Sequence, residues 1–510
     1  MEKVDPRSPC IIGVARHTWH PQDVGEAGAP EPLDMWEQMA RAAADDSGAG
    51  SKVFDALQSV QIVYCQTWQY DDPVAQLSER LGADPSHRFY SGIGGTTPQV
   101  LVNMAAQAML DGELDVALVT GAEALATQKA ARKRGDKYRG SFPPAERAPY
   151  PWEWPPDPRE IAHEASQAWL TFAVFDNARR AHLGVSLDDY RRDIGTMMAP
   201  MTDIAAASPH AWYPIARSVE EIVEARPENR MVGYPYTKYM VSVMDVDMAS
   251  ATLITTHAKA DELGVPADQR VYLRGWCYAN DSVLVAEHDD LWRSPAMAAA
   301  SGEAMRIAGI TADDVAHLDL YSCFPSSVHF GRDALGISAS DSRPLTVTGG
   351  LPYHGGPASN YLGHSIGAMA DALRADSGSY GMVSGVGMFM TKHVYGLYST
   401  TPGPVAPPDT GVQTAIDAAH PARPVLAEHE GKATVAAYSV VHGREAAEWA
   451  LLVCDVENGN GGARTYAKVT DPDLLASAEE RELVGATVQL APTTVTLMTG
   501  GEGRANFATI

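Results

Sequence analysis

Cysteine is scarce and scattered in this chain, with 5 among 510 residues. No two of them form a Cys-x-x-Cys pair, and no histidines follow at a zinc-finger spacing, so we expect neither a zinc finger nor a dense disulfide scaffold. Reduced thiols are typical of the cytoplasm, which is the predicted location. The cysteines are Cys10, Cys65, Cys277, Cys323 and Cys454.

Long apolar runs and basic residues are also in short supply. No stretch approaches the roughly 20 apolar residues that a membrane span needs, and the amino terminus has no signal-peptide core. Lys and Arg total 39 against 64 Asp and Glu, which gives a formal net charge of −25. Because this charge repels a phosphate backbone, we expect no nucleic-acid partner and no membrane span.

Several well-known catalytic motifs are missing. The sequence has no Gly-x-x-x-x-Gly-Lys-Ser/Thr loop, no His-Glu-x-x-His pair and no Gly-x-Ser-x-Gly elbow around Ser384. Nucleotide hydrolysis and metallopeptidase chemistry therefore lose their main support. We predict neither a metal site nor a resident cofactor.

Strand-length apolar segments alternate with amphipathic helical stretches near the amino terminus. Segments 11–15 and 60–65 read as strands, and segments 33–44 and 73–81 read as helices. Such alternation is typical of a layered α/β fold.

A glycine loop, a helix and a strand follow each other twice. The first series runs through 92–98, a helix of small residues and a strand at 116–119, and the second runs through 355–360, 366–375 and 382–383. We interpret this as an internal duplication. If both loops precede helices, their N–H groups can face one shared crevice, which is where open α/β sheets bind ligands.

The remaining segments complete a predicted division into domains. The sequence between the two series loses the strand pattern and indicates an inserted loop domain, whereas a proline-rich linker precedes four short strands that predict a small all-β barrel. The predicted boundaries are 1–126 with 231–265 for an amino-terminal half, 127–230 for the loop domain, 266–400 for a carboxyl-terminal half, 401–424 for the linker and 425–510 for the barrel-like, OB-like domain.

Two polar clusters are candidates for catalysis. His364 lies among glycines just before a helix, so its imidazole can approach a substrate closely, and its ordinary pKa suits proton transfer near neutral pH. Tyr321 and Cys323 follow an apolar strand at the edge where ligands bind. A histidine that only caps its helix is the alternative for His364, and burial as a small hydrophobe is the favoured interpretation of Cys323.

A cluster of basic residues opens the predicted loop domain. Arg132, Lys133 and Arg134 stand out against the negative charge of the chain. A solvated helix face is one interpretation, and a seat for the phosphate groups of a ligand is the other.

These motifs resemble the thiolase superfamily over residues 8–400. The segment from Gly355 to Ala368 is similar to the thiolase pattern Gly-Gly-x-x-x-x-Gly-His-Pro-x-Gly-Ala, and Tyr321 to Phe324 lies where thiolases carry Asn-Glu-Ala-Phe and the sterol-carrier-protein branch carries His-Asp-Cys-Phe. The added barrel looks like that of actinobacterial thiolase-like proteins. The resemblance implies two duplicated α/β/α halves, an inserted loop domain, a coenzyme A (CoA) thioester as substrate or ligand, and a monomer or homodimer.

The departures from the thiolase pattern are as informative as the agreements. The resemblance places Gly95 at the position of the nucleophilic cysteine and Ser384 at that of the second, proton-carrying cysteine, with Gly387 in the following turn. Neither position carries a thiol. An unassisted hydroxyl is a weak nucleophile at neutral pH, so we expect ordinary thiolysis to be weak or absent. The backbone N–H groups of Gly95 and Gly387 could still hold an oxyanion.

Three functions remain open on the sequence. The first is an acyltransferase of the acetyl-CoA acetyltransferase class, acting in lipid metabolism, with His364 as base and with Tyr321 and Ser384 as proton donors. The second is an aldolase or retro-aldolase that acts on a CoA thioester with Tyr321 as acid–base. The third is a non-catalytic protein that binds an acyl-CoA or a lipid-derived small molecule.

Overall fold

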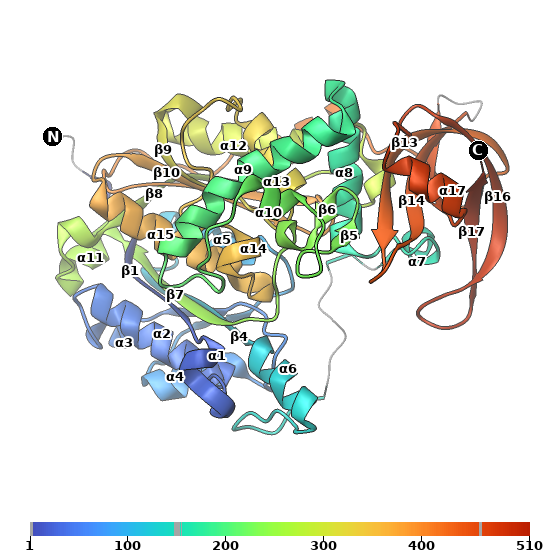
Figure 1. Cartoon of the computed structure of the whole chain (residues 1–510). Helices are drawn as coiled ribbons and strands as arrows, with labels where there is room; N and C mark the ends of the chain where they lie inside the picture. Colours follow the sequence, from blue (N-terminus) through green and yellow to red (C-terminus); the bar gives the residue numbers. More distant parts are fainter. Residues whose placement is uncertain (1–3, 147–152, 155, 458–461, 510) are drawn as a thin grey trace.

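The computed structural model describes residues 4–146, 153–154, 156–457 and 462–509. A large sheet with helices on its faces forms the main body, and a smaller barrel of strands lies beside it (Figure 1). None of the helices in the described ranges has the length and the apolar character that crossing a membrane requires.

The large sheet has nine strands in two similar halves. The strands are β1 (Pro9–Thr18), β2 (Ser59–Ile62), β3 (His87–Tyr90), β4 (Val116–Ala124), β7 (Asp247–Thr256), β8 (Val271–Asn280), β9 (Val315–Asp319), β10 (Tyr380–Gly387) and β11 (Lys392–Ser399), in the order β3-β2-β4-β7-β1-β8-β11-β10-β9. The halves join where β1 pairs with β8 through two residue pairs, Cys10 with Tyr272 and Ile11 with Val271. On each side of this junction, two antiparallel pairings lead to a parallel one. This symmetry confirms the predicted duplication.

The helices repeat in the same way. Helix α2 (Pro32–Asp46) follows β1 and α12 (Pro295–Ala308) follows β8, whereas α5 (Thr97–Asp111) precedes β4 and α15 (Tyr361–Ala375) precedes β10. Helices α5 and α15 touch each other and strands of both half-sheets, so they form a layer between the halves. Other helices of this body are α1 (Pro21–Val24), α3 (Lys52–Asp55), α4 (Pro73–Leu81), α11 (His257–Leu263), α13 (Pro325–Ala334) and α14 (Leu351–His354).

The segment between β4 and β7 is largely helical. Its helices are α6 (Leu125–Arg134), α7 (Pro158–Ala162), α8 (Ala168–Leu183), α9 (Leu187–Ala207) and α10 (Val219–Val223). Helix α8 packs against both α13 and the barrel, so it links the two parts of the molecule (Figure 1).

Five strands close the barrel at the carboxyl-terminal end. They are β13 (Gly431–His442), β14 (Ala447–Val456), β15 (Ala463–Val469), β16 (Thr487–Thr496) and β17 (Glu502–Thr509), and each pairs with two others of the five. Short strands β12 (Val425–Leu426), β5 (Met231–Gly233) and β6 (Tyr236–Thr237) extend this sheet. Residues 231–237, placed by the sequence in the amino-terminal half, thus belong to the sheet of the barrel, which β5 joins through the pair of Gly233 with Val441.

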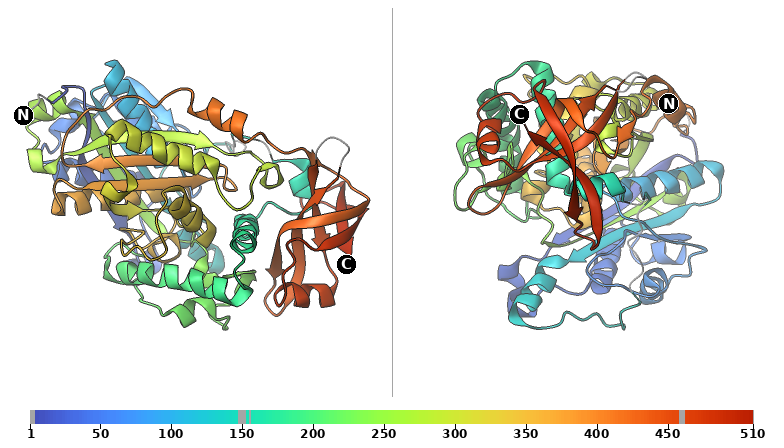
Figure 2. Two further views of the ribbon diagram at one scale, coloured as in Figure 1. Left: turned by 90° about the horizontal axis from the view of Figure 1, so that it is seen from above. Right: turned by 90° about the vertical axis from the view of Figure 1, so that its right-hand side faces the viewer.

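The linker is more structured than its proline content indicates. Helix α16 (Val412–Ala419) forms within the predicted 401–424 segment, and the chain then continues into the barrel (Figure 2). The barrel is anchored by buried polar contacts: the Tyr466 hydroxyl donates to the Glu160 carboxylate at 2.7 Å and accepts from the Ala286 N–H at 2.9 Å. Barrel residues also belong to the same apolar core as α8 and α13.

Candidate active site

The two glycine loops meet at the amino-terminal ends of α5 and α15. The Gly94 N–H donates to Ser359 Oγ at 3.0 Å, and the Asn360 side-chain amide donates to the Gly121 carbonyl at 2.8 Å. Each helix has 15 residues. Because the start of a helix carries partial positive charge and free N–H groups, this convergence suits an oxygen on which negative charge develops.

Gly95 leaves no room for a side chain. A Cβ atom built on it would lie 2.2 Å from the Val386 carbonyl oxygen and 2.3 Å from Tyr321 Oη. Carbon atoms in favourable contact lie about 3.5–4.0 Å apart, so both distances are severe clashes. The Tyr321 hydroxyl therefore occupies the space that the side chain of any other residue at position 95 would need.

Tyr321, Ser384 and Gly387 surround the same point. The Tyr321 N–H donates to Ser384 Oγ at 2.9 Å, because Tyr321 follows β9 and Ser384 lies on the neighbouring parallel strand β10. A Cβ atom built on Gly387 would be 3.6 Å from the Gly95 nitrogen. Four of the predicted site residues are thus brought together.

His364 lies in the first turn of α15 and hydrogen-bonds a second histidine. Its Nδ1 is 3.2 Å from His354 Nε2, and His354 Nδ1 is 3.1 Å from the Thr348 carbonyl oxygen. Since a carbonyl only accepts, this chain assigns the proton to Nδ1 of both histidines. His364 Nε2 is left with a lone pair, and it is buried without a hydrogen-bond partner among the described residues.

An aromatic ring connects the histidine pair with Tyr321. The Tyr361 ring packs edge-on against Tyr321 at 5.6 Å and against His354 at 6.0 Å between ring centroids. The Tyr361 hydroxyl in turn shares a hydrogen bond of 2.6 Å with Thr348 Oγ1. The loop that ends in His354 is therefore fixed relative to Tyr321.

Burial sets the protonation states of these groups. It raises the pKa of Tyr321 well above its usual range, with a further contribution from the Cys323 thiol, so the hydroxyl keeps its proton. Burial lowers the pKa of His364 well below its usual range, and the neighbouring His354 lowers it further. Near neutral pH the site thus holds a neutral proton donor and a neutral proton acceptor.

Comparison with known proteins places this geometry in a family. No protein-family model and no curated protein matches the chain. Among solved structures, a monomeric SCP2-thiolase-like protein type 1 from Mycobacterium smegmatis is 30% identical, with a TM-score of 0.84 over 100% of both chains.

The chain belongs to the SCP2-thiolase-like family. An acetyl-CoA acetyltransferase from Syntrophomonas wolfei matches 78% of this chain and all of its own length with a TM-score of 0.53, and at 16% identity it shows the fold alone. The predicted thiolase fold with an added barrel-like domain is confirmed.

The thiols of this SCP2-thiolase-like protein are buried and protonated. Cys323 is the one nearest to Tyr321 in sequence, and its Sγ donates to Ser327 Oγ at 3.6 Å. Burial raises the pKa of the Cys323 thiol to about 12. The predicted burial of Cys323 is confirmed, and a thiol in this state is a poor nucleophile.

The basic residues predicted to seat a phosphate lie apart from this site. Arg132, Lys133 and Arg134 are exposed in the last turn of α6, and within the described ranges none of them bonds to either glycine loop. No cluster of three or more His, Cys, Asp or Glu side chains suited to a metal ion occurs in these ranges.

Two residues near the site were not predicted from the sequence. His354 stands between Gly350 and Gly355, and this glycine setting was the available signal. Lys392 begins β11, and its side-chain carbons lie 3.3 Å from a Cβ atom built on Gly387. Its ammonium group pairs with Glu153. A single lysine after an apolar run is not a sequence pattern that indicates a functional site.

The buried histidines predict a loss of stability in acid. An unfolded histidine titrates near pH 6.5, whereas burial lowers the pKa of His354 to about 3 and lowers that of His364 well below its usual range. Between these values the unfolded chain binds more protons, so stability is present above pH 6.5 and is lost as the pH falls toward 3. We expect each of the two to contribute up to about 1.4 kcal/mol per pH unit.

Denaturant titrations at pH 7, 6 and 5 measure this slope. His364→Asn removes one titrating group and is expected to flatten it, whereas the control His87→Gln changes an exposed histidine. Equal slopes in His364→Asn and in the unchanged chain would contradict the assignment.

Proposed function

We propose that the protein binds a CoA thioester and makes or breaks the carbon–carbon bond next to the thioester carbonyl, as an aldolase or retro-aldolase without an acyl-enzyme. The position of the Tyr321 hydroxyl carries this proposal. It fills the space of a side chain at position 95, where the thiolase resemblance places the nucleophile, and it puts a proton donor there instead. Loss of that nucleophile makes thiolysis weak or absent.

The cleavage of a 3-hydroxyacyl-CoA would use the two neutral groups of the site. His364 Nε2 accepts the proton of the 3-hydroxyl, the bond between C2 and C3 breaks, and its electron pair forms the thioester enolate. The N–H groups of Gly95 and Gly387 stabilise the enolate oxygen. Tyr321 then donates its proton to C2, and the proton on His364 returns to the tyrosinate, so the enzyme is regenerated beside an aldehyde and a shortened acyl-CoA.

The proposed ligand and assembly state draw on the comparisons. The fold match to an acetyl-CoA acetyltransferase supports a CoA thioester, and the monomeric Mycobacterium smegmatis relative supports a monomer. Arg132, Lys133 and Arg134 remain the proposed seat for CoA phosphates: α6 starts at the same sheet edge as α5, and the three basic residues lie in its exposed last turn, away from the reacting groups. Ser384 is proposed to orient Tyr321 through its backbone.

Two assays on the full chain test the proposed function. With 3-hydroxy-3-phenylpropionyl-CoA we expect release of benzaldehyde, followed by its absorbance, and with acetoacetyl-CoA plus CoA we expect little loss of the enolate absorbance. Fast thiolysis would overturn the proposal in favour of an acyltransferase. CoA binding by calorimetry with turnover of neither substrate would instead leave a non-catalytic binding protein.

A further inference from the structure

A pocket of about 400 Å³ lies between α9, α13 and the segment 338–346. This volume falls within the range of about 300–1,000 Å³ that is usual for small-molecule sites. Apolar side chains of α9, among them Met197, Met201 and Ile204, form one wall, and Arg332 and Arg343 lie on the other side. The residues that line it include none of the proposed catalytic residues.

Of the two arginines of this pocket, one is paired within the chain and the other is not. Arg343 pairs with Asp341 and donates to the carbonyl oxygens of Ala312 and Val315. Arg332 is only 7% exposed, its Nε is buried without a partner, and its guanidinium makes no hydrogen bond or ion pair within the described part of the chain. A buried charge without a partner is strongly unfavourable, so this state calls for an anion from outside the protein.

Neighbouring groups compensate the Arg332 charge only in part. Arg332 lies in the last turn of α13, where the helix dipole favours a cation, but that effect is small beside the penalty for burial. Asp193, also on the pocket wall, lies 3.5 Å from His329 Nε2 instead. His329 chiefly, and Arg332 to a lesser degree, hold the pKa of Asp193 below its usual range.

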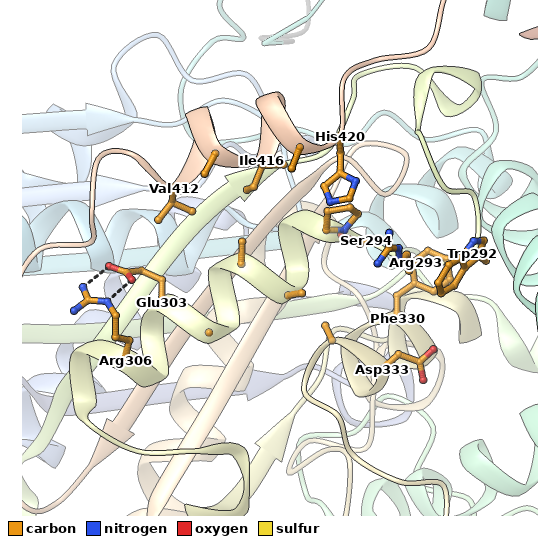
Figure 3. A pocket seen from close by; sticks show the side chains of 17 residues that line it. Trp292, Arg293, Ser294, Glu303, Arg306, Phe330, Asp333, Val412, Ile416 and His420 are labelled. Atoms are coloured by element: carbon orange, nitrogen blue, oxygen red, sulfur yellow. Dashed lines mark hydrogen bonds and ion pairs between the residues drawn. The ribbon is translucent and has the colours of Figure 1, made fainter. Parts of the chain in front are cut away.

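A second and larger pocket has arginines that are all paired. It has a volume of about 630 Å³ and lies between α12, α13 and α16 (Figure 3). Both of its arginines are paired: Arg306 with Glu303 at 2.6 Å, drawn as dashed lines in Figure 3, and Arg293 with Asp290 at 2.7 Å. Its charges are satisfied within the chain and require no ligand.

We propose that the pocket beside Arg332 binds an aliphatic carboxylate, whose anionic group pairs with the Arg332 guanidinium and whose chain lies on Met197, Met201 and Ile204. The planar fork of arginine matches a carboxylate with two parallel hydrogen bonds. A single charge fits better than a dianion such as phosphate, because the carboxylates of Asp193 and Asp341 line the same pocket. This binding site is separate from the proposed chemistry and can be tested without turnover.

Calorimetry and thermal unfolding of the full chain test this site with octanoate, octanamide and inorganic phosphate as probes. Octanoate is expected to bind and to raise the melting temperature, whereas octanamide and phosphate are not. Arg332→Met keeps the aliphatic stem and removes the charge, so octanoate binding should weaken about tenfold or more, the worth of a charge-assisted hydrogen bond. Without ligand, this variant should melt at the same temperature or higher, because an unpaired buried charge has been removed.

A matched control and a second variant complete the test. Arg481→Met changes an exposed arginine of the barrel and should leave octanoate binding unchanged. Ile204→Asp, at a partly exposed position of the apolar wall, should abolish binding while Arg332 is kept. Equal octanoate affinity in Arg332→Met, equal binding of octanamide, binding of phosphate in place of octanoate, or a lower melting temperature of ligand-free Arg332→Met would each overturn the proposal.

Discussion

Tyr321→Phe is expected to lower kcat for aldehyde release by about 10²- to 10⁴-fold, the usual contribution of a positioned proton donor. The substitution removes only the hydroxyl, so the ring still packs edge-on against Tyr361 and KM should change little. Because the pKa of Tyr321 is raised well above its usual range, the unchanged enzyme should keep its rate on the alkaline side of neutrality. Initial rates of benzaldehyde release from pH 6 to pH 9 measure both effects.

Stability separates this catalytic effect from a structural one. Within the described part of the chain Tyr321 forms hydrogen bonds through its backbone N–H and carbonyl and none through its hydroxyl, so removal of the hydroxyl should leave the melting temperature unchanged or raise it slightly. Tyr438→Phe is the matched control: it removes a buried hydroxyl that donates to the Ala478 carbonyl at 2.9 Å in the barrel. It should cost stability of about 1 kcal/mol and leave the rate unchanged. Full activity in Tyr321→Phe would show that another group donates the proton.

Local signals in the sequence were enough to predict much of the fold. Helix α4 begins and ends as predicted, at Pro73 and Leu81, because Asp72 caps its first turn and Gly82 adopts a left-handed conformation after it. The predicted duplication followed from two glycine loops that each precede a helix. Four barrel strands were predicted for a similar reason, since short apolar alternation lies between turn residues.

Features that depend on distant partners could not be predicted in this way. Strand β17 is not among the four strands predicted for the barrel, and it forms because β16 pairs with it along its length. Strand β5 contacts β13 through Gly233 and Val441, which are far apart in the sequence. The lack of a partner for Arg332 is likewise a property of the folded chain, because Asp333 and Asp341 lie near it in sequence and pair with other arginines.

In the candidate site, too, local patterns were predicted and contacts between distant residues were not. The glycine setting of His364 is a local pattern and was recognised, whereas the hydrogen bond from His364 to His354 depends on how the loop 349–360 folds back. The relation between Gly95 and Tyr321 is a contact across 226 positions of sequence, as 321 − 95 = 226. Sequence reasoning found both residues, but only the structure shows that one fills the place of the other.

That relation predicts a large loss of stability in Gly95→Ala. Its new methyl group would meet the Val386 carbonyl oxygen at 2.2 Å and the Tyr321 hydroxyl at 2.3 Å, and neither is the free end of a flexible side chain. Overpacking of this kind costs about 1–3 kcal/mol and occasionally more, and we expect the upper end here because one obstacle is backbone. Denaturant unfolding of the variant and of the unchanged chain measures the loss.

A neighbouring glycine and a double variant make this test specific. A Cβ atom built on Gly94 would approach no atom closer than 3.6 Å, so Gly94→Ala should cost much less than Gly95→Ala. Combining Gly95→Ala with Tyr321→Phe removes the clash with the hydroxyl but keeps the ring carbon Cζ, which a Cβ atom at position 95 would meet at 2.7 Å. The double variant should therefore be less destabilising than the sum of its parts, toward the lower end of the coupling of about 0.5–3 kcal/mol for residues in contact. Strict additivity, or equal losses at positions 94 and 95, would mean that the tyrosine hydroxyl does not occupy the space beside Gly95. In that case a thiol restored by Gly95→Cys could act as a nucleophile, whereas with the hydroxyl in place we expect that variant to gain no thiolysis.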